Sequence, residues 1–513
     1  MSGRGIVARN ILANALGGSW VVVMSLAAIP FQIRILGAEA FGLLGFVASL
    51  QIFLTVLDFG LATTVNREIA GDVSPDRSFS RDLVSTAGAV YWVIAALTGI
   101  GLASSAGWLA GHWLVLERMT VVEAAGAIRV MALWVAFTWP TTLYASVLTG
   151  LQRLDVVNGL RVATSTLTLG GSIVLLLVTR DFQILLWWMA GNALFSLALH
   201  ATICKSICPW LSLGLRPSAA VVRRVWRFSL DMNVISVLAV FFTQLDRLLI
   251  GRLLPLRMLG YYNTAYSLAR GIAIIQGFVN SAVLPALASD FAHGRIEEMR
   301  LRYAKYAQAL VFGIVLPAAV LIFYGGDVLR AWATAEAADG AHWATSILAI
   351  GFLLNATMSA PYTLSVATGH TRIPRLVNLV GAPFYGLLLY MMIRRWGLDG
   401  AALGWLLLNL YYVFSLLPLT QRVILRSSAL DWLRRNLLPS VAAGLSTFGL
   451  IGWLVAKWSP NGPAIPWIAC AVSAVLYIVA GYWFLSPRLK SDLQTLACQL
   501  LTEIRVLPLG APK

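Results

Sequence analysis

The chain has 513 residues, of which 59% are hydrophobic and 12% are charged. Soluble globular proteins carry about 25% charged residues, so this composition excludes a soluble enzyme, a nucleic-acid-binding protein and a disordered scaffold. The net charge of +16 is instead typical of a membrane protein with Lys and Arg in its cytoplasmic loops.

Apolar segments that are long enough to cross a membrane recur along the whole chain. A transmembrane helix needs about 20 mostly apolar residues, and a signal peptide has a shorter apolar core, so we expect an uncleaved first helix. Fourteen such segments are predicted, at residues 11–34, 41–65, 83–109, 124–148, 158–178, 183–203, 228–250, 260–284, 305–325, 343–368, 376–394, 399–420, 437–457 and 465–486. The sequence therefore predicts an all-α polytopic membrane protein with about 14 transmembrane helices.

The distribution of basic residues predicts the orientation of these helices. If the N-terminus is cytoplasmic, the inner segments hold 26 Lys and Arg and the outer segments hold 11. Cytoplasmic loops carry the excess of Lys and Arg in membrane proteins, so both termini are expected in the cytoplasm.

Residues of the two halves coincide when the chain is shifted by 218 positions. The coinciding pairs are Arg34 and Arg252, Leu36 and Leu254, Gly42 and Gly260, Ser49 and Ser267, Leu50 and Leu268, Ala70 and Ala288, and Asp72 and Asp290. Six predicted helices separate the two copies, so both copies run in the same direction through the membrane. We therefore expect two parallel six-helix lobes at 1–215 and 216–425, two appended helices at 426–486 and a cytoplasmic tail at 487–513. Transporters built from repeats place the substrate site at the repeat interface.

Arg270 lies about ten residues inside the predicted helix 260–284. A charged side chain at the bilayer centre costs about 2.5–3.5 kcal/mol and therefore faces a cavity or a partner. One face of this helix carries Asn263, Ser267, Arg270, Gly277, Asn280 and Ser281. This pattern favours the wall of a water-filled cavity, and the alternative is a buried ion pair of Arg270 with Asp246 or Asp231.

The first predicted helix has a similar polar stripe. It consists of Asn10, Asn14, Gly17, Ser25 and Gln32. The stripe indicates either a cavity wall with Asn14 as a substrate ligand or close helix packing through small residues.

Arg34 and Arg252 occupy matched repeat positions near the predicted outer ends of their helices. Snorkelling of the side chains to the membrane surface explains both residues. Alternatively, two symmetric guanidinium groups would bind a diphosphate through charge-assisted hydrogen bonds.

Three carboxylates within predicted helices are candidates for ion coupling. They are Asp58, Asp231 and Asp246. Asp58 is the best candidate in the first half, and its alternative role is a capped pair with a neighbouring helix.

The sequence carries no catalytic or metal-binding motif that we recognise, and the spacing of its four Cys makes no metal site. We therefore expect no enzyme and no cofactor. A membrane glycosyltransferase, ligase or polymerase is an alternative, because the predicted outer loop 326–342 holds Asp327, Glu336, Asp339 and His342.

Several stretches of the sequence resemble the polysaccharide-biosynthesis flippases of the multidrug/oligosaccharidyl-lipid/polysaccharide exporter (MOP) superfamily. They are Ile35–Gly42, Leu57–Leu61, Asn66–Ala70, Gly150–Arg153 with Asn158, Gln244–Leu248 and Leu259–Tyr262. The resemblance covers the whole chain in the number of predicted helices and only these stretches in detail.

The resemblance implies a two-lobed transporter in the bacterial inner membrane that moves a polyprenyl-diphosphate-linked oligosaccharide from the inner to the outer leaflet. It also implies a proton or sodium gradient as the driving force, and a polysaccharide polymerase and export machinery as partners. A multidrug exporter and a peptidoglycan-precursor flippase of the same superfamily are the alternatives. For the lipid-linked anionic oligosaccharide, Arg270, Arg34, Arg252, Asn14, Asn263 and Asn280 are the expected binding residues.

Overall fold

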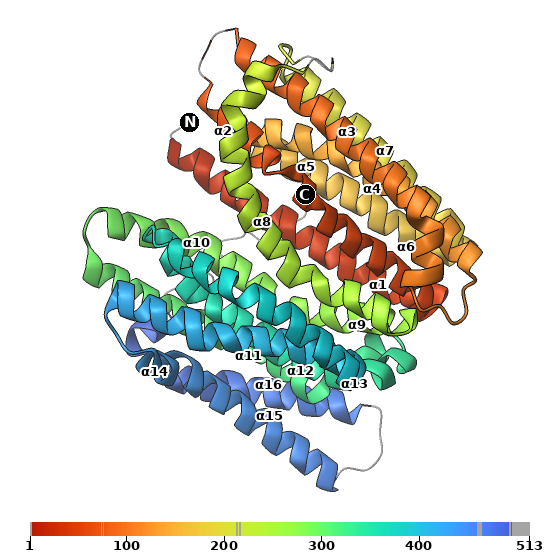
Figure 1. Ribbon diagram of the computed structural model, residues 1–513. Helices are drawn as coiled ribbons and strands as arrows, with labels where there is room; N and C mark the ends of the chain where they lie inside the picture. Colours follow the sequence, from red (N-terminus) through yellow and green to blue (C-terminus); the bar gives the residue numbers. More distant parts are fainter. Residues whose placement is uncertain are drawn as a thin grey trace, which may run out of the picture. The chain divides into compact units, whose positions relative to one another are not determined.

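The regular structure of the described residues is entirely helical (Figure 1), apart from one isolated β-bridge between Val115 and Pro255. The computed structural model describes residues 3–72, 74, 76–211, 214, 217–458, 464–491 and 494, and the side chains of these residues except for 3–16, 224–236, 278 and 456. The predicted all-α class is confirmed, and most of the predicted tail 487–513 lies outside the described residues.

The first half of the chain forms seven α-helices, with one 3-10 turn and two π-helical turns between some of them. The helices are α1 (Gly3–Leu54), α2 (Leu61–Gly71), α3 (Ser78–Trp108), α4 (Val121–Gly150), α5 (Leu154–Ser165), α6 (Gly171–Thr179) and α7 (Phe182–Ile207). The turns are η1 (Thr55–Asp58), η2 (Leu109–Trp113) and η3 (Thr166–Gly170).

The second half begins with α8 and ends with two further apolar helices. Its helices are α8 (Ala219–Leu253), α9 (Leu256–Arg270), α10 (Ile272–Ala292), α11 (Ile296–Trp332), α12 (Ala335–Ala367), α13 (Arg372–Thr420), α14 (Ala429–Trp432), α15 (Leu438–Trp458) and α16 (Ile465–Phe484). Two π-helical turns, η4 (Gln421–Leu425) and η5 (Leu433–Leu437), flank α14.

The described residues contain eleven helical stretches that are long and apolar enough to cross a membrane, so the predicted count of fourteen is not confirmed. Two of the stretches, 17–58 and 372–425, are 42 and 54 residues long and each include parts of two predicted helices. The predicted helix 228–250 lies within α8, which is not one of the eleven.

Glycines bend the two longest helices near the places where the sequence predicts a loop. Gly37 within α1 has φ 81° and ψ 166°, and Gly397 within α13 has φ 57° and ψ −129°. Residues with a Cβ rarely adopt positive φ, so glycine allows the chain to turn at these two positions.

The predicted helix 41–65 is interrupted in its second half. Phe59 and Gly60 have φ 49° and 71°, and α2 begins at Leu61. The predicted helix 41–65 is therefore interrupted between η1 and α2, because two successive left-handed residues separate them. The break leaves Asp58 at the end of η1.

Side-chain caps explain where two helices begin. The Oγ1 of Thr120 accepts a hydrogen bond from the amide of Glu123 (3.2 Å), and the Glu123 carboxylate accepts one from the amide of Thr120 (2.8 Å). Asp181 accepts hydrogen bonds from the amides of Gln183 and Ile184 at the start of α7. Each cap satisfies amide groups that have no partner in the first turn of a helix.

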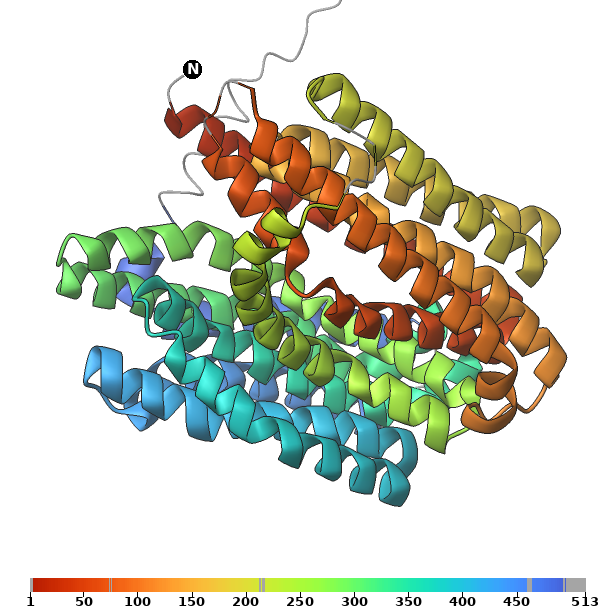
Figure 2. The same ribbon diagram turned by 45° about the horizontal axis from the view of Figure 1, so that its top comes forward.

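The chain divides into two compact units that interleave along the sequence. The first unit comprises residues 1–268, 328–344 and 378–404, and the second comprises 269–327, 345–377 and 405–513. In the first unit, α4 packs against both α3 and α7, and the three helices run side by side in the ribbon views (Figures 1 and 2). The predicted domain boundaries at 215, 425 and 486 stay a prediction.

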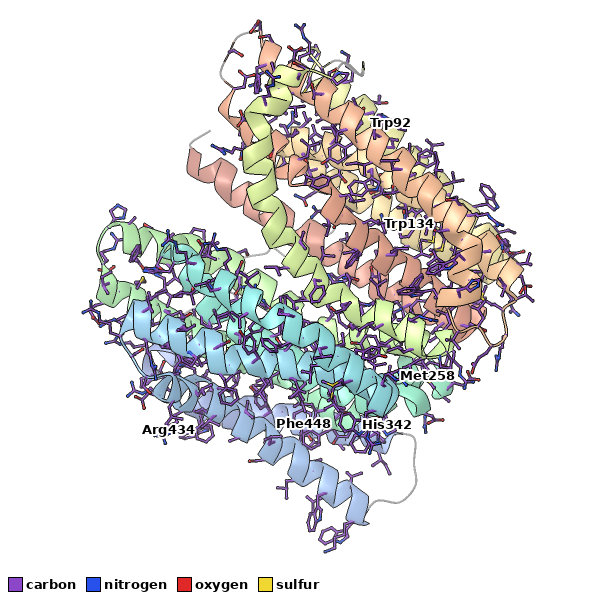
Figure 3. The ribbon with its side chains drawn as sticks, viewed as in Figure 1. Trp92, Trp134, Met258, His342, Arg434 and Phe448 are labelled. Carbon is purple, nitrogen blue, oxygen red and sulfur yellow. The ribbon has the colours of Figure 1, made fainter. Side chains whose placement is uncertain are left out.

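In the second unit, α15 packs along α16. Phe448 on α15 is fully buried against Phe323 and Tyr324, and the hydroxyl of Tyr477 on α16 donates a hydrogen bond to the carbonyl of Phe312 (2.8 Å). Large apolar side chains also lie on the outside of both units, among them Trp92 of α3 (Figure 3). An apolar exterior is the surface that a bilayer solvates.

Candidate functional site

A buried arginine and a buried carboxylate connect α8 to α9 in the first unit. Arg247 is 8% exposed, and its Nε donates a hydrogen bond to Oδ1 of Asn263 (3.0 Å). Its Nη1 donates to the carbonyl of Thr243 (2.9 Å) and to Oε1 of Gln244 (3.1 Å). The guanidinium carbon lies 3.8 Å from the ring centroid of Tyr266, a cation–π contact.

Asp246 is the carboxylate of this network, and only 1% of it is exposed. It accepts hydrogen bonds from the hydroxyl of Tyr262 (2.6 Å) and from the amide of Arg247 (2.8 Å). Buried polar groups need hydrogen-bond partners, and these two bonds provide them for the carboxylate. The candidate coupling residue Asp246 is thus held between α8 and α9.

Asn263 extends the same network to α1. A Cβ at Gly45 would lie 1.8 Å from Nδ2 of Asn263, so a larger residue at position 45 would displace the amide group of Asn263. The sequence predicts Asn263 on a cavity wall, whereas the structure places it in the packed contact of α9 with α1, 8% exposed.

The predicted phosphate ligands Arg34 and Arg252 both bind the carbonyl end of a helix. Arg34 donates hydrogen bonds to the carbonyls of Ala331 (2.6 Å), Trp332 (3.2 Å) and Ala333 (2.5 Å) at the end of α11. Arg252 donates to the carbonyl of His112 (2.6 Å) near the end of η2. Arginine suits these positions because the last carbonyls of a helix are unpaired and carry negative charge.

The first unit contains a symmetric glycine contact between α1 and α9. A Cβ at Gly42 would lie 2.2 Å from the carbonyl oxygen of Leu256, and a Cβ at Gly260 would lie 2.0 Å from that of Ala38. Gly260 and Leu256 follow Gly42 and Ala38 by 218 residues each. The two repeats therefore cross near their predicted outer ends through equivalent residues.

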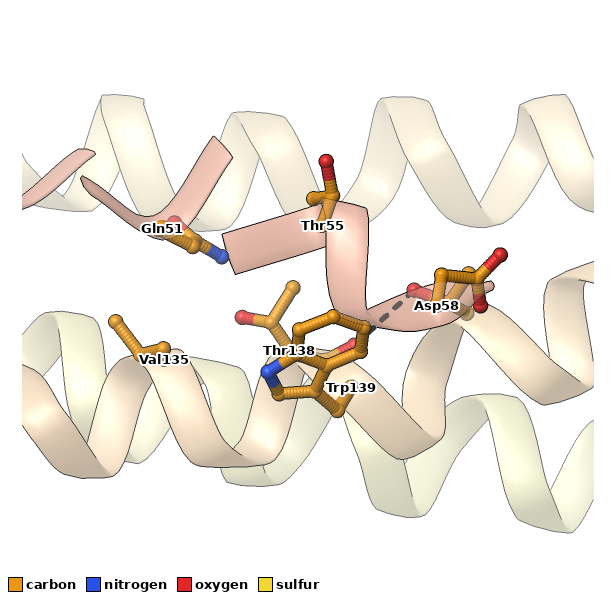
Figure 4. Close-up of a pocket in the computed structure, with 7 residues that line it drawn as sticks. Gln51, Thr55, Asp58, Val135, Thr138 and Trp139 are labelled. Carbon is orange, nitrogen blue, oxygen red and sulfur yellow. Dashed lines mark hydrogen bonds between the residues drawn. The ribbon is translucent and has the colours of Figure 1, made fainter. Parts of the chain in front are cut away.

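A small cavity lies beside Asp58, at the end of η1. Its volume is about 200 Å³, and it is lined by Gln51, Thr55, Asp58, Val135, Thr138, Trp139 and Thr142 (Figure 4). Asp58 accepts hydrogen bonds from the hydroxyl of Tyr91 and from the amide of Ala62 (3.2 Å). The carboxylate therefore combines a structural contact to α2 and α3 with access to a small cavity.

Arg270 is exposed at the end of α9, within the apolar stretch 256–292. It forms no ion pair or hydrogen bond with any residue whose side chain is described. Asp246, its predicted alternative partner, accepts hydrogen bonds from Tyr262 and Arg247 instead.

The remaining candidates differ in what surrounds them. Asn280 in the second unit accepts hydrogen bonds from the hydroxyls of Tyr306 and Ser359 (3.4 Å to the latter). The side chains of Asn14 and Asp231 lie outside the described residues. Among the described residues, no group of His, Cys, Asp and Glu is placed to hold a metal ion.

Three functional candidates in the structure are absent from the sequence-based set: Arg247, Tyr262 and Tyr91. Arg247 is a charge inside a predicted helix, next to Asp246, and this adjacency could have identified it. The partnership of Tyr91 with Asp58 spans 33 residues and depends on packing, so no local pattern could have indicated it.

Comparisons with known proteins agree with this architecture. The family described as "Polysaccharide biosynthesis protein" matches residues 7–290, more than half of the chain. A protein of Shigella flexneri named "Putative O-antigen transporter" is 22% identical over 430 residues, which are 83% of this chain and 97% of that protein.

Two solved structures of low sequence identity have the same fold. The lipid II flippase MurJ in an inward closed conformation has a TM-score of 0.71 at 11% identity, over 92% of this chain and 98% of MurJ. An inward-facing multidrug resistance MATE transporter of the MOP superfamily has a TM-score of 0.66 at 14% identity, over 79% and 95% of the two chains. The chain therefore belongs to the polysaccharide biosynthesis protein family and has the fold of the MOP superfamily.

Proposed function

We propose that the protein is a flippase that moves a polyprenyl-diphosphate-linked oligosaccharide from the inner to the outer leaflet of a bacterial cytoplasmic membrane. The family match and the relative named as an O-antigen transporter, 97% of which is matched, support this function. The headgroup of such a lipid is anionic, so a flippase needs basic groups at membrane depth.

The exposed side chain of Arg270 is the observation that carries the proposal. It lies in an apolar stretch of 37 residues that is long enough to cross a membrane. An arginine at this depth is stable only where water or an anion solvates it. Arg270 therefore binds the diphosphate through charge-assisted hydrogen bonds while the polyprenyl chain stays in the bilayer.

The mechanism that we propose is alternating access. In this conformation Arg34 and Arg252 bind helix-end carbonyls, and Gly42 and Gly260 keep α1 and α9 in contact. The headgroup enters from the cytoplasmic side. When α1 and α9 separate at their predicted outer ends, both arginines lose their carbonyl partners and become available to the departing diphosphate.

Asp58 is the carboxylate that we propose for ion coupling, with Asp246 and Asp231 as further candidates. Its cavity is lined by four other polar side chains, Gln51, Thr55, Thr138 and Thr142, and oxygen atoms of this kind suit a proton or a sodium ion. Both termini would lie in the cytoplasm, and a polysaccharide polymerase and export machinery would act on the product.

Replacement of Arg270 by alanine tests the proposed function. Loss of the charge-assisted contact should lower export of the lipid-linked sugar about tenfold or more, with unchanged protein level and with lipid-linked sugar accumulating on the inner leaflet. Arg129→Ala is the matched control, because Arg129 is also exposed within a membrane-spanning helix but lies in its third turn, near the surface. Full export by Arg270→Ala would remove Arg270 from the mechanism.

A multidrug exporter is the second transport function to be tested. Cationic drugs require acidic binding sites, and the exposed charge at Arg270 has the opposite sign. Resistance to cationic dyes that the protein confers and that Asp58→Asn abolishes would favour the drug-exporter function, whereas export of a peptidoglycan precursor would identify a different lipid-linked cargo.

A further inference from the structure

A second cavity, of about 360 Å³, lies in the second unit at the predicted cytoplasmic ends of α11 and α13. Its lining includes Arg300, Tyr303, Gln421, Arg426, Asp431 and Arg435. None of these residues belongs to the candidate transport site.

The cavity has an excess of positive charge. Arg300 pairs with Glu297 (2.6 Å) and donates a hydrogen bond to the carbonyl of Leu425 (3.1 Å), while its Nε is buried without a hydrogen bond among the described residues. Arg426 and Arg435 are exposed and form no ion pair with any residue whose side chain is described. Glu297 offsets the charge of Arg300, and Asp431, the single acidic residue of the described lining, offsets one of the other two guanidinium charges, so one positive charge is in excess.

The floor of the cavity is buried and held by hydrogen bonds. Tyr303 and Gln421 are 2% and 1% exposed, and Nε2 of Gln421 donates to the hydroxyl of Tyr303 (3.1 Å). The Oγ of Ser427 donates to Oε1 of Gln421 (2.7 Å), which fixes the loop to the floor. The basic groups therefore surround a preformed site, which reduces the entropic cost of binding.

The backbone around the cavity is strained. Arg426 has φ 50°, a left-handed conformation that costs energy for any residue with a Cβ. The π-helical turns η4 and η5 lie on either side of the loop, and such turns are frequent at functional sites. The left-handed residue ends η4 and begins the loop that leads to α14.

The sequence neighbours of the lining residues are apolar and exposed. Val423, Leu430 and Leu438 are 53%, 53% and 52% exposed. A soluble anion needs no such surface, whereas a phospholipid places acyl chains beside its phosphate. Basic pockets between transmembrane helices on the cytoplasmic side suit anionic lipid headgroups.

We propose that this cavity binds the phosphate of an anionic phospholipid of the cytoplasmic leaflet, with Arg300, Arg426 and Arg435 as its ligands and the acyl chains on the apolar surface of η4, α14 and α15. The proposed lipid is not the transported cargo. The proposal rests on the predicted orientation of the helices, which places these ends on the cytoplasmic side.

Lipid binding by the purified full-length protein tests this site. Native mass spectrometry would compare the wild type with Arg426→Gln/Arg435→Gln in detergent that contains phosphatidylglycerol. Arg422→Gln/Arg434→Gln is the matched control, because it removes the same charge from neighbouring exposed residues outside the cavity; Arg434 is labelled in Figure 3. We expect the cavity variant to bind phosphatidylglycerol at least about tenfold more weakly than the wild type. The control should bind it as tightly as the wild type does.

Three further measurements test whether the bound phosphate belongs to a phospholipid and whether Arg426 acts only by stabilising the fold. Millimolar inorganic phosphate should not displace phosphatidylglycerol, and a polyprenyl diphosphate should not bind more tightly than the phospholipid. Arg426→Gly should bind less lipid without a lower melting temperature in lipid-free detergent, because glycine adopts φ 50° without strain. Equal lipid binding by the cavity variant and the wild type, an equal loss in the control, or preference for phosphate or polyprenyl diphosphate would overturn the proposal.

Discussion

Arg247 is the residue whose surroundings most limit the choice of side chain. Asn263, Gln244 and the carbonyl of Thr243 accept its hydrogen bonds, and Tyr266 covers its guanidinium group. A side chain without donors here would leave the buried oxygens of Asn263 and Gln244 without these hydrogen bonds. The network therefore connects α8, α9 and α1 whether or not Asp246 also carries an ion.

Replacement of Arg247 by methionine should strongly destabilise the protein. Loss of the guanidinium group leaves buried acceptors without their donor, at a cost of about 1–3 kcal/mol each, and the free energy of unfolding in mixed micelles would measure this loss. Arg257→Met is the control, since Arg257 pairs with Glu117 at 3.0 Å in a half-exposed ion pair that contributes about 1 kcal/mol or less. Similar losses in both variants would contradict the assignment of Arg247 to a buried network.

Asp72 makes a pH-dependent contribution to stability. Hydrogen bonds from Ser74 and Ser80 lower the pKa of Asp72 from 3.8 to about 2. A lowered pKa means that the folded state favours the ionised carboxylate, so the contribution is present above pH 3.8 and is lost as the pH falls through about 2. The difference in melting temperature between wild type and Asp72→Asn should be constant near neutral pH and shrink in this acidic range. A difference in melting temperature that does not change over this range would contradict the lowered pKa of Asp72.

At the scale of elements, the contact of α1 with α9 depends on glycines at equivalent repeat positions. Gly260→Ala would place a Cβ 2.0 Å from the carbonyl oxygen of Ala38, so the two helices must separate. Hydrogen–deuterium exchange should therefore rise in the segments 36–46 and 254–264. The same variant should populate the conformation that is open to the outside.

Gly101→Ala in α3 is the control for this substitution. A Cβ at Gly101 meets no atom within 4 Å, so the change adds only helix propensity, about 1 kcal/mol at most. Unchanged exchange in Gly260→Ala, or an equal rise in Gly101→Ala, would show that the close approach does not hold the outer ends together.

The repeat found in the sequence has structural counterparts in several elements. Asp72 accepts hydrogen bonds from Ser74 and Ser80, so it links the end of α2 to the first turn of α3. Its counterpart Asp290 pairs with Arg295 and Arg302 at the start of α11. A carboxylate at the same repeat position thus stabilises the same kind of connection in each half, with different partners.

At the scale of the whole molecule, hydropathy predicted the class of the protein and the places of most helices. A run of apolar residues indicates membrane burial directly, so this part of the fold is readable from sequence. Interruptions of helices were less predictable. Gly37 and Gly397 bend a helix without ending it, whereas Phe59 and Gly60 end one inside an apolar run.

The candidate site was predictable only in its residue types. Intramembrane charge identified Asp58, Asp246 and Arg270 as special, because such groups are costly in a bilayer. Their partners were not predictable, since Tyr91 and Tyr262 reach the two carboxylates through tertiary packing. The same limit applies to Arg34 and Arg252, whose repeat symmetry was visible while their carbonyl partners were not.

Reconstituted transport is the most direct test of the proposed function. Purified protein in liposomes would receive a polyprenyl-diphosphate-linked oligosaccharide with a fluorescent headgroup, and an impermeant quencher would report the leaflet under a proton or sodium gradient. The account predicts gradient-dependent movement by the wild type and by Arg129→Ala, and movement that is about tenfold slower or more in Arg270→Ala. Movement at the same rate in protein-free liposomes, or equal movement by Arg270→Ala, would contradict it.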